Sequence, residues 1–229
     1  MYHELRKRGT GLVEAAVGCA IVTAIHRGGI HMTAILQSLE RTILAGLVLL
    51  IVIIVVVGTV TGQFIKPDHA WATFVMRWLH VISGIMWIGL LWYFNFVQIP
   101  TVPKIEPVEH RAAITKYIAP SALFWFRYAA LATVITGALV AWMSGYLVQA
   151  LTLRPGHIAI GLGMWLALIM AFNVWFIIWP NQQKVLGLVP ATPEEKTAAG
   201  RTAMLTSRIN TLLSIPMLFC MVAQQNAGL

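Results

Sequence analysis

Charged side chains are scarce in this sequence. Asp, Glu, Lys and Arg make up 10% of its 229 residues, whereas 59% are hydrophobic. A soluble domain carries about 25% charged residues, so this composition excludes an ordinary water-soluble fold. The apolar residues also form runs as long as the ~20 residues that cross a bilayer core. We therefore expect an all-α, polytopic membrane protein whose main surroundings are a lipid bilayer.

Cysteine is nearly absent as well. Cys19 and Cys220 stand far apart in apolar sequence, which excludes a disulfide framework, and no C-x-x-C-H motif is present to attach a c-type haem. The net charge of +8 does not indicate nucleic-acid binding, because the basic residues lie between the apolar runs and form no continuous stripe.

Five apolar segments predict about five transmembrane helices. We expect them over residues 42–65, 70–99, 121–151, 156–179 and 207–224. Pro100, Pro103 and Pro107 are expected to end the second helix, Pro180 to end the fourth, and Pro216 to kink the fifth. A polar loop containing Pro193, Glu194 and Glu195 is expected before the fifth helix.

The beginning of the chain allows several interpretations. We expect a cytoplasmic or peripheral segment over residues 1–42 and a transmembrane helical domain over 43–229. The apolar stretch 11–25 is short and is interrupted by Glu14, so it suits either a peripheral amphipathic helix or a weak span. Met32 is an alternative start of the chain, in which case residues 1–31 are an over-extended reading frame.

The distribution of Lys and Arg predicts an orientation. With five spans and the N-terminus inside, thirteen of the 16 basic residues fall on the inner side. Such an excess is typical of cytoplasmic loops. We therefore expect the N-terminus inside and the C-terminus outside.

Ionisable residues inside a membrane are costly and are usually functional. Arg77, His80 and Gly84 follow one another at helical spacing in the second segment, so they share one face. Imidazole is a common axial ligand of haem iron. His80 would bind the iron, Gly84 would leave room for the macrocycle, and Arg77 would pair with a propionate. In the alternative interpretation, His80 only forms a hydrogen bond to a neighbouring helix.

The fourth segment repeats the spacing with His157 and Gly161. A haem b between His80 and His157 is one prediction, with both histidines as metal ligands. The alternative is that His157 is an interfacial histidine at a helix start. His69 is a further candidate partner, or a solvated loop residue.

A second group of polar residues is expected near the inner membrane surface. It would suit an anionic ligand or a quinone head group, although helix capping and lipid head-group contacts are the favoured interpretation. Its members are Asn95, Arg127, Asn173, Asn181, Arg208 and Asn210.

Three stretches resemble a known membrane family. RWLHVISGIMWIGLLWYFNFVQIP (77–100), GMWLALIMAFNVWFIIWPNQQKVLG (163–187) and AMLTSRINTLLSIPMLFCMVA (203–223) are similar to the membrane domain of the bacterial cytochrome-type urate hydroxylases. The helix with His80 also resembles, over a shorter stretch, that of the membrane-bound oxygen-independent protoporphyrinogen oxidases. These resemblances imply a four-helix bundle of helices two to five, a b-type haem on His80 and a bacterial cytoplasmic membrane.

The sequence allows two functions, a redox protein and an accessory subunit. The urate enzymes commonly carry a C-terminal cytochrome c domain, and this chain has no haem c motif before its end at Leu229. An oxidoreductase or electron-transfer function would therefore need a separate cytochrome c or quinone. No Asp or Glu falls within the expected helices two to five, so no acid–base site is visible. The alternative is a non-catalytic accessory subunit of a larger membrane complex. A transporter is disfavoured because no inverted repeat is found.

Overall fold

The computed structural model describes residues 33–224 and 226, and these described residues divide into two compact units on either side of the Lys66–Pro67 bond. The described residues contain no strand and include five helical spans that are long and apolar enough to cross a membrane. The prediction of an all-α membrane protein with five transmembrane helices is thus confirmed. The stretch 11–25 lies outside the described residues, and the boundary expected at residue 42 stays a prediction.

The first unit contains one membrane-length helix, α2 (Leu39–Thr61). It begins after Ser38 and ends at Gly62, which adopts a left-handed conformation with φ of +68°. Glycine is favoured at this position because it lacks the Cβ that the conformation would strain.

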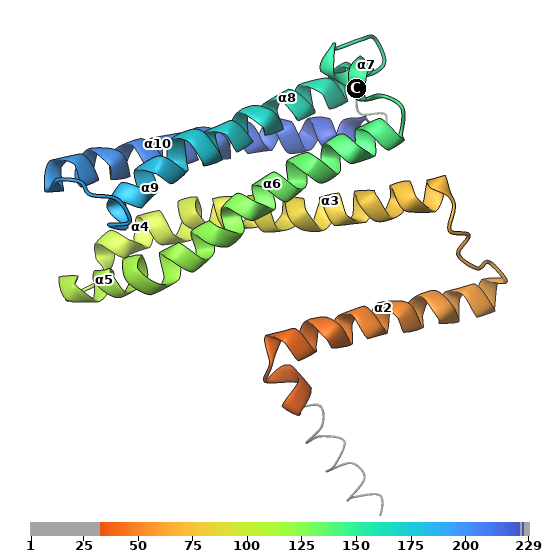
Figure 1. Cartoon of the computed structure of the whole chain (residues 1–229), viewed down its shortest axis with the longest axis horizontal. Coiled ribbons are helices and arrows are strands. Elements are labelled where there is room, and N and C mark those ends of the chain that lie inside the picture. The colour runs from red at the N-terminus through yellow and green to blue at the C-terminus, as the bar shows by residue number, and fades with distance from the viewer. Residues whose placement is uncertain (1–32, 225, 227–229) are drawn as a thin grey trace, which may run out of the picture. The chain divides into compact units, whose positions relative to one another are not determined.

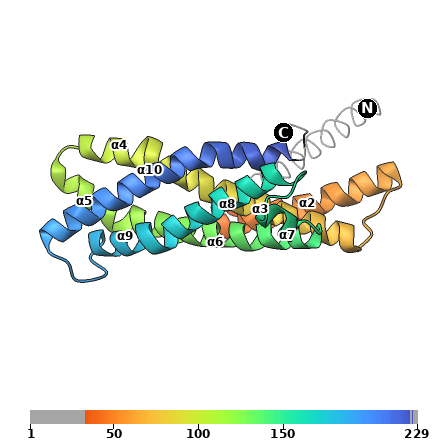
Figure 2. The same ribbon diagram turned by 90° about the horizontal axis from the view of Figure 1, so that it is seen from above.

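The second unit is a bundle of four spans (Figure 1 and Figure 2). The first span joins α3 (His69–Trp92), η1 (Tyr93–Gln98), α4 (Ile99–Thr101) and η2 (Val102–Lys104). The second joins η3 (Val108–His110), α5 (Arg111–Ala113), η4 (Ile114–Ile118) and α6 (Ala119–Met143). The short helix α7 (Leu147–Leu151) follows. The third span joins α8 (Ile158–Phe172), η5 (Asn173–Ile178) and α9 (Trp179–Val185), and the fourth is α10 (Pro193–Ala223). Helix α3 packs mainly on α6, and α8 mainly on α10.

Three of the prolines inside continuous spans closely follow a π-helical stretch. The π-helices η1, η4 and η5 end two residues before Pro100, Pro120 and Pro180. A proline ring in an α-helix collides with the carbonyl four residues earlier. Here that residue lies in the wider π turn in every case, so the helix continues. The expected helix ends at Pro100 and Pro180 were therefore wrong.

Several further boundaries differ from the sequence expectation, and two of them have a clear local cause. The second bundle span stops at Met143, not at residue 151, because Gly145 turns left-handed and the Tyr146 N–H closes the helix end on the Ala141 carbonyl at 3.0 Å. Helix α10 begins at Pro193, fourteen residues earlier than expected. Its first turn is fixed by a capping box between Thr192 and Glu195.

The largest fully buried side chains lie near the middle of the spans. Trp87, Leu91, Phe126 and Met170 are fully buried there. We call the end of the bundle nearer to these prolines the proline end and the opposite end, with α7, the α7 end (Figure 1). Toward the α7 end, α3 buries no side chain completely before Trp87.

Helix α10 joins the other spans through buried polar side chains. Asn210, which is completely buried, donates to the Met170 carbonyl at 3.0 Å and accepts from Asn173 at 2.8 Å. Ser207 accepts from Asn95 at 2.8 Å, and Ser214 accepts from Trp92 at 3.0 Å. Two of these bonds lead to the first bundle span and the others to the third, so α10 connects both.

We expect the Asn173–Asn210 pair to be energetically coupled. Each alanine substitution should lower the free energy of unfolding by about 1–2 kcal/mol, because it leaves a buried amide group unpaired. A double-mutant cycle in detergent micelles should give a coupling of about 0.5–2 kcal/mol. Thr202→Ala is the control, since that exposed hydroxyl bonds only within its own helix. A coupling near zero would contradict the assigned bond.

Candidate functional site

His80 lies on the face of α3 that packs against α6. Its Nδ1 is 2.9 Å from the Thr133 carbonyl oxygen and 3.3 Å from Thr136 Oγ1. A carbonyl only accepts, so Nδ1 must carry the hydrogen. In the neutral ring the lone pair then lies on Nε2. This tautomer is the one in which a metal-binding histidine is usually held, with one nitrogen donating to a carbonyl.

A glycine on α6 makes room for this imidazole. A Cβ on Gly137 would lie 2.7 Å from His80 Cε1 and 3.1 Å from Nδ1. Gly84, the expected source of space, is four residues further along α3, and a Cβ there would meet only Thr133 Cγ2 at 3.9 Å. The close approach at His80 therefore depends on Gly137. Gly84 faces the turn of α6 that contains Thr133, and a methyl group added at Gly84 would fit there.

Gly137 and Thr133 were not among the residues expected from the sequence. A pattern was present, since small residues four apart on an apolar helix are typical of close helix packing in membranes. Without knowing that α3 and α6 are partners, the pattern does not show which side chain it accommodates.

Arg77 and His157 both lie near Tyr146, which follows α6. The rings of Tyr146 and His157 stack with centroids 5.9 Å apart and an interplanar angle of 29°. Burial raises the pKa of the Tyr146 phenol, and the charge of Arg77 acts in the opposite direction. Arg77 Nε is buried and has no hydrogen-bond partner. Tyr146 thus links two predicted site residues that are far apart in the sequence.

The two predicted metal ligands contact different neighbours. The ring of His80 lies against α6, whereas that of His157 stacks on Tyr146. Gly161 faces α7, where a Cβ would collide with the Ala150 carbonyl and with Leu153 Cδ2. Its lack of a side chain lets α7 pack closely on α8. Ligation of one iron by both His80 and His157 stays a prediction.

His69 has a partner in the structure. Its Nε2 donates to the Met143 carbonyl at 2.9 Å, at the last residue of α6. The bond satisfies a carbonyl that the helix end leaves open. His69 therefore connects the start of α3 with the end of α6.

The polar residues expected near the inner surface mostly pair with other helices or stack on aromatic rings. Asn95, Asn173 and Asn210 take part in the contacts of α10 described above. The Arg127 guanidinium lies 3.1 Å from the ring centroid of Trp179, a cation–π arrangement. These residues are not gathered around one ligand site.

Together these features define a multi-pass helical membrane protein with a histidine oriented inside one span. Residues 139–227 match the family model described as "Urate oxidase N-terminal". The match confirms the family resemblance over that part of the chain, from the end of α6 through α10. It includes His157 and Gly161 and leaves out Arg77, His80 and Gly84. No curated protein and no solved structure matches the chain.

The glycines of α3 and α6 should respond differently to substitution. Gly137→Ala should lower the free energy of unfolding by about 1–3 kcal/mol, because the new methyl overlaps the imidazole of His80. Gly84→Ala should be neutral or stabilising by up to about 1 kcal/mol, since alanine favours the helix. Thermal unfolding of both variants in one detergent tests this. Equal destabilisation by the two substitutions would contradict the assigned packing.

Tyr146 should ionise later than an exposed tyrosine. Its raised folded-state pKa means that the protonated phenol is favoured by folding. That stabilisation is present below the unfolded-state pKa of about 10 and is lost as the pH rises through the folded value. Phenolate absorbance against pH, compared with Tyr146→Phe, isolates this group. Arg77→Leu should move the ionisation of the Tyr146 phenol to still higher pH. An unchanged titration would show that Arg77 and Tyr146 are not close.

Proposed function

We propose that this chain is a b-type haem protein of the urate hydroxylase membrane-domain kind, with His80 as an axial ligand. The observation that carries the proposal is the arrangement of His80. It lies within a membrane span and donates Nδ1–H to the Thr133 carbonyl, which leaves the lone pair of the ring on Nε2. A second-sphere carbonyl bond of this kind fixes ring orientation and increases ligand basicity.

Arg77 supports the proposal. Arg77 is one turn from His80 on α3, and its buried Nε lacks a partner. A propionate oxygen would satisfy that donor with a charge-assisted hydrogen bond. Around His80, the side chains of α3 toward the α7 end stay only partly buried. A bound macrocycle would supply one-electron chemistry, while the chain orients the ligand and neutralises a carboxylate.

The redox partner is a separate molecule in this proposal. Hydroxylation of urate with water releases two electrons and two protons, which need an acceptor such as a cytochrome c or a quinone. Urate is one candidate substrate, supported by the family match over residues 139–227.

We also propose a bacterial cytoplasmic membrane with the N-terminus inside, supported by the excess of Lys and Arg on that side. The proline end then faces the cytoplasm and the α7 end faces outward, which places His80 in the outer half of the bundle.

A reduced-minus-oxidised visible spectrum tests the proposal. The detergent-purified protein should show a b-type α-band that is lost in His80→Ala and kept in His69→Ala, whose histidine bonds a helix end. Arg77→Leu should retain the band and shift the midpoint potential. Loss of the band in His157→Ala as well would support ligation by both histidines. A wild-type protein without any haem band would contradict the proposal and favour an accessory subunit of a larger complex.

A further inference from the structure

The proline end contains a cavity that the His80 site does not use. Its volume is about 490 Å³, within the range of small-molecule sites. All four spans of the bundle line it, and its most buried lining residues are Phe126, Ala203 and Ile178. The prolines account for its position, because the lining includes residues of η1, η4 and η5 or of the turns next to them.

The lining is uncharged but not wholly apolar. It contains no Lys, Arg, Asp or Glu. Gln98 contributes a buried Oε1 that has no hydrogen-bond partner. Ser207 accepts from Asn95 Nδ2 at 2.8 Å, so its hydroxyl hydrogen remains able to donate into the cavity. The residues around the cavity thus include one unpaired acceptor, enclosed by its neighbours, and one donor, among side chains that are otherwise mostly apolar.

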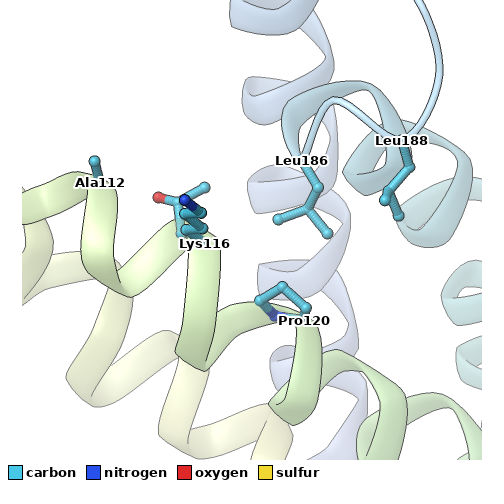
Figure 3. Close-up of a pocket in the computed structure, with 6 residues that line it drawn as sticks. Ala112, Lys116, Pro120, Leu186 and Leu188 are labelled. Atoms are coloured by element: carbon cyan, nitrogen blue, oxygen red, sulfur yellow. The ribbon is translucent and has the colours of Figure 1, made fainter.

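A second hollow of about 440 Å³ adjoins this cavity and shares Thr115 and Leu186 with it. Figure 3 shows Ala112, Lys116 and Pro120 on one side of the hollow and Leu186 and Leu188 on the other. Apart from Lys116 and Thr115, its lining is aliphatic. An extended ligand that entered the inner cavity would leave its tail against these aliphatic side chains.

We propose that this cavity binds an uncharged ring with a hydrogen-bond donor and an aliphatic tail, the chemistry of a quinol. A charged ring is disfavoured, because an ion without a counter-charge is costly to bury. A donor on the ligand that reached the Gln98 oxygen would satisfy it, and a buried acceptor without a partner costs about 1–3 kcal/mol. The donor on Ser207 suits a second oxygen on the same ligand.

The proposal is independent of haem at His80. The cavity residues do not include any of the predicted haem-site residues, so a His80→Ala protein should keep the cavity and its ligand. Binding measured in that variant therefore separates failure of the haem proposal from failure of this one.

The quinol analogue 2-heptyl-4-hydroxyquinoline N-oxide is a suitable probe, because it combines a neutral donor-bearing ring with an alkyl tail. Calorimetric titration of the detergent-solubilised chain, against protein-free micelles, should show one saturable site. Gln98→Leu should weaken binding about tenfold, the loss expected for one buried hydrogen bond. Gln149→Leu, at the α7 end and outside the cavity, is the matched control and should bind normally.

A second pair of variants tests the volume without touching a polar group. A Cβ on Gly200 meets only Val185 Cγ2, at 3.6 Å, so Gly200→Ala should fold and bind. Gly200→Leu should fill the cavity and abolish binding. Absence of saturable binding to the wild type would overturn the proposal. Wild-type affinity in both Gln98→Leu and Gly200→Leu would overturn it as well. So would a phospholipid that co-purifies with the wild type, is lost in Gly200→Leu and is not displaced by the probe.

Discussion

The bundle depends on the hydrogen bonds that α10 makes across its buried face. Lipid tails are as apolar as leucine, so burial of apolar side chains does not by itself hold helices together in a bilayer. Ser207, Asn210 and Ser214 lie about a turn apart and bond the first and third bundle spans. Polar groups at these depths have few alternative partners. They therefore fix which helices meet and in what register, and apolar packing completes the contact.

The sequence was sufficient for the fold class and for the number of spans, because long uncharged runs leave few other structures. It was insufficient for helix ends. Pro100 and Pro180 predicted breaks, since proline usually disrupts an α-helix, and the compensating π turns have no comparable sequence marker. Glu194 and Glu195 suggested a loop before the last helix. They form a first helical turn, where Glu195 pairs with the backbone of Thr192.

For the candidate site, the sequence identified His80 and Arg77 because ionisable residues stand out in an apolar span. It assigned the open space to Gly84, on the same helix, since only local spacing can be followed along a chain. The residue that contacts the imidazole most closely is Gly137, on another helix. Tyr146 was missed for the same reason, because its place between Arg77 and His157 follows from tertiary packing. The cavity at the proline end likewise depends on four spans converging.

The π-helical stretches change the rotational phase of their spans. One extra residue in a helical turn rotates everything beyond it by about 100° relative to an uninterrupted α-helix. In the span from His69 to Lys104, the stripe that carries His80 therefore does not continue straight past η1. Deleting one residue from η1 would bring the two halves back into phase, but it would also return Pro100 to an α-helical turn, where its ring collides with the carbonyl four residues earlier. The same deletion would turn Gln98 away from the cavity while leaving the surroundings of His80 in place. The proline and the rotational phase of the span are thus coupled, because removing the π turn changes both.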